Sequence, residues 1–143
     1  QTNGQVDAFV QSVGTAASIR GVSEILKEKK PSMKVFAVEP AESAVLSGEG
    51  SGAHNIEGIG IGFAPPLWDA KGVDEILRVS TEDAKAMARR LASEEALFAG
   101  TSSAANVKAA LSVAEKLGPG ATVVTLMIDS GLKYLSTDLY RSS

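Results

Sequence analysis

Residues 6–39 read VDAFVQSVGTAASIRGVSEILKEKKPSMKVFAVE, and this stretch decides the fold. Val6–Gln11 is short and apolar, which predicts a strand. After a turn of small residues, apolar side chains recur with helical spacing until Pro31, which prevents the helix from continuing. Lys34–Glu39 then predicts a second strand. A strand, a helix and a strand in this order are typical of two parallel strands joined by a right-handed crossover.

The same alternation continues through the rest of the chain. The further predicted strands are Ile76–Val79, Leu97–Ala99 and Val123–Ile128. The last is apolar throughout, so we expect it to be buried on both faces. A helix is predicted after the N-cap Ser80, and another over Ala104–Leu117. This pattern predicts an α/β domain, an open three-layer α/β/α arrangement with a mostly parallel twisted sheet and helices on both faces.

Composition narrows the class of protein. The chain has 143 residues and a formal net charge of −3, which fits one globular domain and argues against a nucleic-acid partner. Its longest apolar runs fall far short of the ~20 residues that span a bilayer, so no membrane partner is expected. The lack of cysteine excludes a disulfide scaffold and a thiol nucleophile, and it suits a cytoplasmic location.

The turn Ser12–Ser18 is the first candidate site, because ligands of parallel sheets bind where strands end. Its small residues allow backbone N–H groups to close around an oxyanion at the positive end of the following helix. Thr15 and Ser18 add hydroxyl groups, so a phosphate monoester is the natural ligand. The alternative is a small, polar turn that only caps the helix.

Two other segments are candidate binding segments because they are rich in glycine or serine. Gly58, Gly60 and Gly62 alternate with isoleucine, which would let a loop approach a flat ligand closely or would form an irregular edge. In Gly100–Ser103 we expect one serine to be the N-cap of the next helix. The only histidine, His54, is best interpreted as a structural hydrogen-bonding residue, and no metal site is expected.

Several segments in order resemble one enzyme family. They are Thr2–Val10, Gly14–Ser18, Val38–Pro40, His54–Phe63, Gly100–Ser103 and Tyr134–Leu139. Together they resemble the C-terminal portion of cysteine synthase, or O-acetylserine sulfhydrylase, a pyridoxal phosphate (PLP) enzyme of fold-type II. The resemblance implies the tryptophan synthase β-like fold, with residues 1–143 as the C-terminal part of the catalytic domain.

The resemblance assigns cofactor-binding roles residue by residue. Gly14, Thr15, Ala16, Ala17 and Ser18 take the place of the Gly-Thr-Gly-Gly-Thr loop that holds the PLP phosphate. Alanine at the two glycine positions costs on the order of 1 kcal/mol if the backbone there is left-handed. Either these positions have ordinary backbone angles, or the site is weaker or displaced.

The pyridine end of the cofactor is assigned in the same way. Ser102 matches the serine that hydrogen-bonds the pyridine nitrogen, and Gly58 and Gly60 match the loop beside the ring. A neutral hydroxyl does not hold a proton on that nitrogen. The ring is then a milder electron sink, which suits β-elimination of a good leaving group.

The lysine that binds the cofactor covalently lies upstream in this family, and no lysine here matches it. We therefore expect no catalytic residue in this chain and no activity from it alone. The implied reaction of the longer parent enzyme joins O-acetyl-L-serine and sulfide to give L-cysteine and acetate. The implied partners are the N-terminal portion, a second subunit in a homodimer and serine acetyltransferase. Alternatives are cystathionine β-synthase-like chemistry, or a non-catalytic fragment or binding module.

Overall fold

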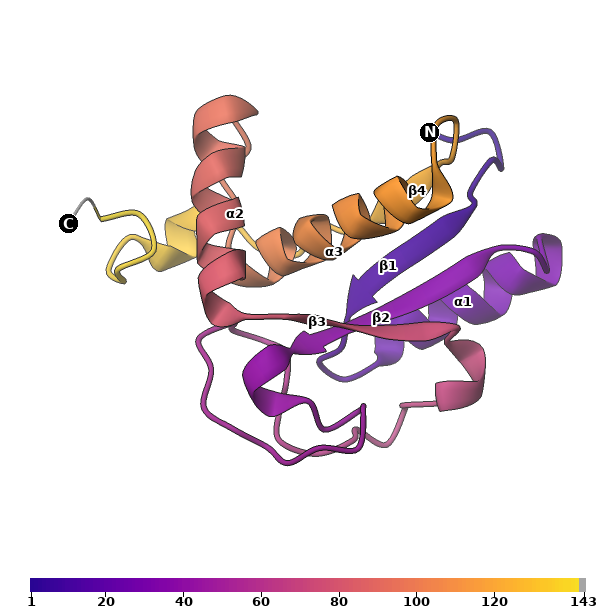
Figure 1. Cartoon of the computed structure of the whole chain (residues 1–143), viewed down its shortest axis with the longest axis horizontal. Helices are drawn as coiled ribbons and strands as arrows, with labels where there is room; N and C mark the ends of the chain where they lie inside the picture. Colours follow the sequence, from indigo (N-terminus) through magenta and orange to yellow (C-terminus); the bar gives the residue numbers. More distant parts are fainter. Residues whose placement is uncertain (142–143) are drawn as a thin grey trace.

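The computed structural model describes residues 1–141, and its centre is a four-stranded parallel sheet (Figure 1). The strands are β1 (Ala8–Ser12), β2 (Lys34–Pro40), β3 (Glu75–Val79) and β4 (Val123–Thr125), in the order β3-β2-β1-β4. Every pairing is parallel. The predicted α/β class is therefore confirmed. The strand order switches at β1, because β2 and β3 lie on one side of it and β4 lies on the other.

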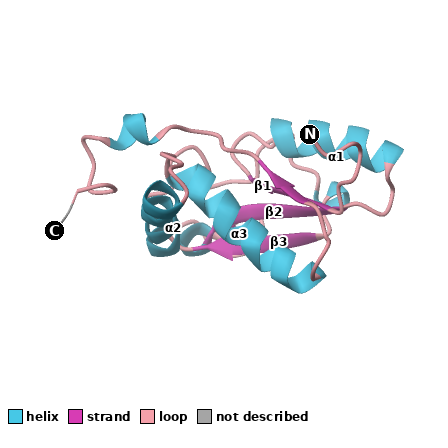
Figure 2. Cartoon of the chain, turned by 90° about the horizontal axis from the view of Figure 1, so that it is seen from above, coloured by secondary structure: helices cyan, strands magenta, loops and turns pink. Residues whose placement is uncertain are grey.

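Helices cover both faces of this sheet, as predicted. Helix α1 (Ala17–Lys29) packs its apolar side against β1 and β2 through a cluster that includes Phe9, Val35 and Ala37. Helix α3 (Thr101–Leu117) runs across the opposite face and buries Ala105, Ala109 and Val113 there (Figure 2). Alternate residues of β1 thus enter two separate cores, as the period of a strand requires.

Helix α2 (Thr81–Glu94) lies beside α3 rather than on the sheet (Figure 1). Ser80 is its N-cap as predicted: the Ser80 hydroxyl accepts from the Asp83 N–H at 3.1 Å and donates to the Asp83 carboxylate at 2.9 Å. The other elements are the 3-10 turns η1 (Ala41–Ser43), η2 (Ala70–Gly72) and η3 (Gly131–Tyr134).

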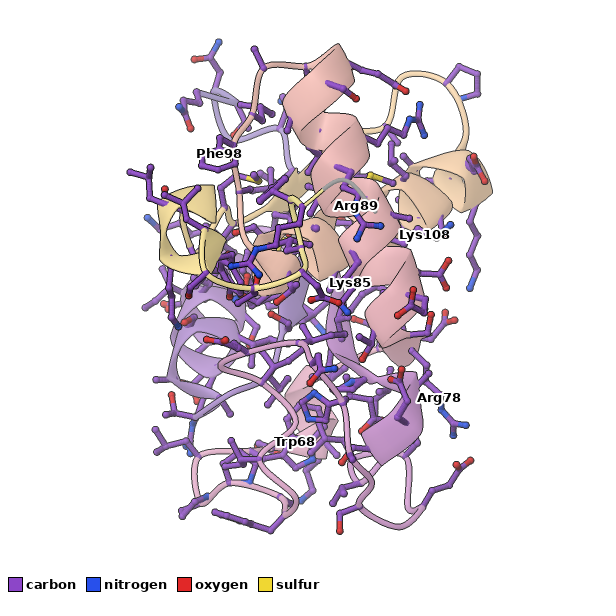
Figure 3. All side chains as sticks on the ribbon, turned by 90° about the vertical axis from the view of Figure 1, so that its left-hand side faces the viewer. Trp68, Arg78, Lys85, Arg89, Phe98 and Lys108 are labelled. Carbon is purple, nitrogen blue, oxygen red and sulfur yellow. The ribbon has the colours of Figure 1, made fainter. Side chains whose placement is uncertain are left out.

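The predicted strand Leu97–Ala99 is wrong. Only Ala99 makes a bridge, which is antiparallel and joins it to Ser130. Ala96 has a left-handed backbone (φ 56°) and turns the chain at the end of α2, while Leu97 and Phe98 are exposed. Phe98 packs its ring against Tyr140 instead, with the ring centroids 4.6 Å apart (Figure 3 labels Phe98).

The prediction for Val123–Ile128 is right about a strand and wrong about its length and burial. β4 has three residues, all half-buried, because it lies at the edge of the sheet with β1 on one side only. The chain beyond it leaves Leu126, Met127 and Ile128 between 39% and 49% exposed. Leu132 and Leu135 are more exposed still, so apolar surface gathers after this edge strand.

Candidate functional site

The turn between β1 and α1 carries a series of free backbone donors. Val13 still donates to the Val38 carbonyl of β2, at 3.0 Å. Beyond it, five N–H groups have no acceptor within residues 1–141: those of Gly14, Thr15, Ala16, Ser18 and Ile19. They lie at the N-terminal, positive end of α1, and the side chains of Thr15 and Ser18 are exposed beside them. This donor set is suited to an oxyanion.

Ala16 adopts the left-handed backbone, with φ 67° and ψ 0°. The first of the two possibilities for the alanine pair, ordinary backbone angles, is therefore wrong at this position. Its methyl group is 3% exposed and lies in the α1-side core with Val13 and Ile19, pointing away from the open turn. Ala17 is the first residue of α1 and is exposed. The strain is thus confined to one residue whose side chain the core holds.

The glycine-rich loop lies directly against this turn. Gly58, Gly60 and Gly62 all have positive φ, between 60° and 86°, which explains why glycine recurs there. A Cβ on Gly14 would overlap the Gly58 carbonyl oxygen, and the Gly60 N–H donates to the Val13 carbonyl at 3.3 Å. The loop and the turn therefore form one continuous wall.

Helix α3 begins earlier than predicted, at Thr101, with Gly100 as its N-cap. The expectation that a serine caps it is wrong, because a Cβ at residue 100 would overlap the Asp129 carboxylate and the Tyr134 ring. Asp129 caps the helix from outside: its Oδ1 accepts from the Ser103 N–H at 3.2 Å and from the Ser103 hydroxyl at 2.6 Å.

Ser102 lies in the first turn of α3 and is 4% exposed. Neither its hydroxyl nor its N–H has a partner in the described part of the chain. One helical turn later, Asn106 Oδ1 accepts the N–H of Ser12, the last residue of β1, at 2.7 Å. The structure therefore brings Ser102 and the Gly14–Ser18 turn to the same carboxyl edge of the sheet, next to β1, where the strand order switches.

Sequence reasoning missed the residues that brace this edge. Asn106 is fully buried and also donates to the Leu126 carbonyl at 2.9 Å. The Tyr134 hydroxyl donates to Asp129 Oδ2 at 2.5 Å, and burial together with this bond raises the pKa of Tyr134 well above its ordinary value of 10. The available signal was an asparagine within the alanine-rich face of a helix, since a buried amide needs partners.

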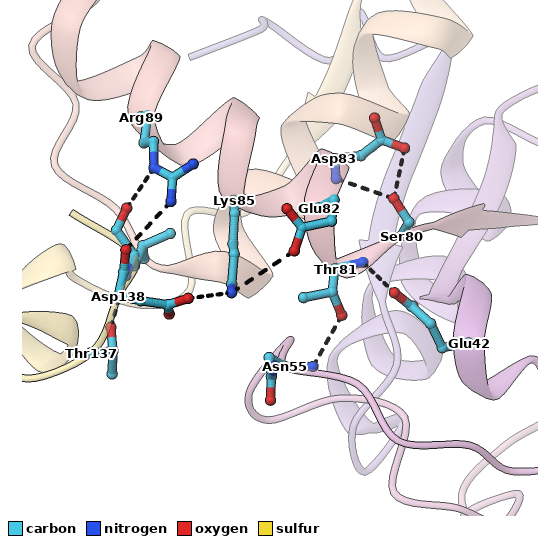
Figure 4. Close-up of polar contacts among 11 residues, drawn as sticks. Glu42, Asn55, Ser80, Thr81, Glu82, Asp83, Lys85, Arg89, Thr137 and Asp138 are labelled. Carbon is cyan, nitrogen blue, oxygen red and sulfur yellow. Dashed lines mark hydrogen bonds and ion pairs between the residues drawn. The ribbon is translucent and has the colours of Figure 1, made fainter. Parts of the chain in front are cut away.

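A cavity of about 360 Å³ borders the same loop. Its lining includes residues 54–59, Thr101, Tyr134, residues 137–139 and Lys85. Lys85 points from α2 toward the C-terminal segment and pairs with the Asp138 carboxylate at 2.8 Å (Figures 3 and 4). Gly58 lines this cavity, whereas Ser102 and the Gly14–Ser18 turn do not.

The remaining expectations concern metals and membranes. Within residues 1–141, no three His, Cys, Asp or Glu side chains are grouped so that they could hold a metal ion. None of the helices in this part of the chain combines the length and the apolar character needed to cross a bilayer.

Comparison with known proteins places this arrangement in a family. The chain is 43% identical to a cysteine synthase of Staphylococcus aureus over 135 residues, 94% of this chain and 44% of that protein. The structure superposes on O-acetyl serine sulfhydrylase isoform 3 from Entamoeba histolytica with a TM-score of 0.94 and 47% identity, covering 99% of this chain and 43% of that one. The structure also superposes on an O-acetylserine dependent cystathionine beta-synthase from Helicobacter pylori, with a TM-score of 0.91 and 35% identity. This superposition covers 96% of this chain and 45% of that one.

The chain thus spans less than half the length of the relatives that it matches. Residues 1–129 match the family described as "Pyridoxal-phosphate dependent enzyme". This match includes the free N–H groups of the Gly14–Ser18 turn, the glycine-rich loop and Ser102 at the start of α3. The chain belongs to the family of pyridoxal-phosphate dependent enzymes.

Proposed function

We propose that this chain is the cofactor-holding C-terminal part of an enzyme that converts O-acetyl-L-serine and sulfide into L-cysteine and acetate. The observation that carries the proposal is the row of unpaired N–H groups at Gly14–Ser18 on the same sheet edge as the unpaired Ser102 hydroxyl. The identity of 43% to a cysteine synthase over almost the whole chain supports this substrate class.

The residues present fit pyridoxal phosphate at both of its polar ends. Free N–H groups and the hydroxyls of Thr15 and Ser18 would hold the phosphate at the N-terminus of α1. Ser102 would meet the pyridine nitrogen, and the loop of Gly58 and Gly60 would lie beside the ring. A side chain on Gly58 would begin in open space, whereas one on Gly60 would overlap His54 and Pro40. When bound, the cofactor withdraws electrons from the amino acid and allows its β-substituent to leave.

Ser102 sets how strongly electrons are withdrawn. Its hydroxyl is neutral and can donate to, or accept from, a ring nitrogen, but it does not keep a proton there. Asp129 holds the neighbouring Ser103 hydroxyl at 2.6 Å, and so leaves Ser102 as the hydroxyl of this turn without a partner in the described residues. A moderate electron sink favours β-replacement over transamination.

Surface features support a missing partner segment. The exposed apolar residues after β4, Leu126–Ile128 with Leu132 and Leu135, are of the kind that an interface covers. We propose that an N-terminal portion carrying the cofactor-binding lysine packs here. Homodimer formation, binding of serine acetyltransferase and a cytoplasmic location remain proposals of the same kind.

A second candidate activity is the formation of cystathionine from O-acetylserine. The likeness to an O-acetylserine dependent cystathionine beta-synthase, with a TM-score of 0.91, favours it. The sulfur acceptor separates the two candidates: the assembled enzyme should use sulfide in one case and homocysteine in the other.

The test begins with the purified 143-residue chain and added pyridoxal phosphate. We expect it to bind the cofactor weakly and to make no cysteine, because the covalent lysine is absent. Adding the N-terminal portion of the parent enzyme should restore cysteine synthesis. Turnover by this chain alone would contradict the proposal, since one of its own lysines would then carry the reaction.

Two variants at one position test the assigned role of Ser102 in the assembled enzyme. Ser102→Ala should lower turnover while the cofactor stays bound, and Ser102→Asp should impair β-replacement by keeping the ring nitrogen protonated. Ser112→Ala, at an exposed serine on the same helix, is the matched control and should change neither. Normal turnover in both Ser102 variants would remove Ser102 from the site.

A further inference from the structure

His54 uses both of its ring nitrogens inside one short loop. Nδ1 accepts the Ile56 N–H at 3.3 Å, and Nε2 lies 3.0 Å from the Gly60 carbonyl oxygen. A nitrogen that accepts carries no proton, so the proton is on Nε2, which donates to Gly60. The ring therefore closes the segment 54–60 through both of its nitrogens.

The His54 ring packs so closely against Gly60 that residue 60 has no room for a side chain. Its φ is 60°, and a Cβ there would lie 2.7 Å from His54 Nε2 and 2.8 Å from Pro40 Cδ. The Gly60 N–H points the other way and donates to the Val13 carbonyl, one residue before Gly14. Gly60 thus connects the imidazole to the turn that carries the free N–H groups.

The rest of the segment is held by side chains, because it has no regular secondary structure to pair with. The Asn55 N–H donates to the Thr81 hydroxyl at 3.0 Å (Figure 4), and the Glu57 N–H donates to the Thr101 hydroxyl at 3.3 Å. Ile56 and Ile59 are buried in the core on the α3 side. These contacts hold residues 55–59 of the loop in place, and His54 holds its end at Gly60.

We infer that His54 is a positioning residue: its two hydrogen bonds hold the Gly58–Gly60 wall against the Gly14 turn. The inference rests on the proposed function in that this wall borders the cofactor. All of these contacts lie within the chain itself. Both nitrogens are occupied within the loop, so His54 acts through Gly60 and not on the reacting atoms.

Two conservative substitutions separate the two hydrogen bonds. The Oδ1 of an asparagine can replace Nδ1 as the acceptor for Ile56, whereas its side chain is too short for Gly60. The amide of a glutamine can replace Nε2 as the donor to Gly60 and leaves Ile56 unpaired. Amide hydrogen exchange of the cofactor-free chain, followed by NMR, reads the Ile56 bond directly. It reads the Gly60 end through the Gly60 N–H, whose bond to the Val13 carbonyl is protected only while the loop is held against the turn.

We expect reciprocal exchange patterns. His54→Asn should speed exchange of the Gly60 N–H about tenfold and spare Ile56, and His54→Gln should do the reverse. His54→Ala should speed both, while the Val10 N–H in the centre of the sheet is unchanged. Pyridoxal phosphate, titrated into each chain and followed by its absorbance, should bind several-fold more weakly to His54→Ala and His54→Asn than to His54→Gln.

Unchanged exchange at Gly60 in His54→Ala would overturn the inference. Faster exchange at Gly60, Ile56 and Val10 alike would also overturn it, since that pattern reports a general loss of stability. The two proposals can fail separately. If the variants show the expected exchange pattern but the wild-type chain binds no pyridoxal phosphate, the proposed function is contradicted and the positioning role of His54 is still supported.

Discussion

Gly14 and Gly58 pack backbone against backbone, so closely that a Cβ on Gly14 would overlap the Gly58 carbonyl oxygen. This contact joins the free N–H groups of the turn to the glycine-rich loop. Gly14→Ala should therefore destabilise the chain by about 1–3 kcal/mol, because backbone and not a flexible side chain must move. Urea unfolding of the variant measures the loss.

Gly21 supplies the control for this prediction. It lies within α1, and a Cβ there would meet no atom within 4 Å. Gly21→Ala should stabilise the chain by roughly 0.5–1 kcal/mol through helix propensity. Equal effects of the two substitutions would mean that the Gly14 contact does not constrain the fold.

The left-handed Ala16 predicts an unusual pair of substitutions. Ala16→Gly relieves roughly 1–2 kcal/mol of backbone strain. It also loses about 0.8 kcal/mol of methyl burial and adds about 0.4–1 kcal/mol of unfolded-chain entropy. The net change should be within about 1 kcal/mol of zero.

Ala16→Val should instead lose more than about 2 kcal/mol, because a β-branched side chain at positive φ is a strong outlier and the two added methyl groups would enter a buried position. Thermal or urea unfolding of both variants measures these changes in the free energy of unfolding. A valine variant as stable as the wild type would show that the turn can leave the left-handed conformation at little cost.

The fold was predictable from the sequence wherever local pattern and tertiary context agree. The helix that follows residue 16, its end before Pro31, and the Ser80 cap are all set by neighbouring residues and are confirmed. The run Val123–Ile128 was misjudged because an apolar sequence does not reveal that its strand lies at a sheet edge. Burial depends on which strands pair, and that is a long-range property.

The same distinction between local and long-range features applies to the candidate site. The candidate anion turn could be located from its small residues after a strand. The cap of α3 could not, since Asp129 reaches Ser103 from 26 residues away and leaves no room for a side chain on Gly100. The structural role of His54 was expected from its isolation in the sequence, but its two specific partners follow only from the folded loop.

Asn106 is predicted to be the most sensitive polar residue at this edge. Its amide accepts from Ser12 at 2.7 Å and donates to Leu126 at 2.9 Å, with no exposure to solvent. Asn106→Ala leaves the buried Ser12 N–H and the part-buried Leu126 carbonyl unpaired, and it should cost about 3 kcal/mol in urea unfolding. Ser112→Ala, on the exposed side of the same helix, should cost less than about 0.5 kcal/mol.

Asn106→Asp distinguishes lost hydrogen bonds from lost volume. The new side chain keeps its size but cannot donate to Leu126 when ionised, and it would bury a charge. At neutral pH it should be at least as damaging as alanine, and part of the loss should return under mild acid when the carboxyl is protonated. A variant whose stability loss is the same at both pH values would contradict this account.

Asp74 predicts how the fold responds to acid. Burial alone would raise its pKa, but hydrogen bonds from Lys27, the Val35 N–H and Lys34, at 2.8, 2.8 and 3.0 Å, outweigh burial and lower the pKa from 3.8 to about 2. The carboxylate ties the end of α1 to β2, at the start of β3. Because the folded chain takes up this proton at a lower pH than the unfolded chain, Asp74 stabilises the fold above its ordinary pKa.

That contribution, about 1 kcal/mol once solvent screening at this exposed residue is allowed for, should be fully present at neutral pH and should disappear as the pH falls from about 4 to 2. Asp74→Asn should therefore lower the free energy of unfolding at pH 7 and flatten its decline between those two pH values. Glu115→Gln, at an exposed carboxyl group on α3, is the control and should leave the decline as steep as in the wild type. Urea unfolding at a series of pH values measures all three chains. An equally steep decline in Asp74→Asn would mean that other carboxylates, and not Asp74, govern acid unfolding.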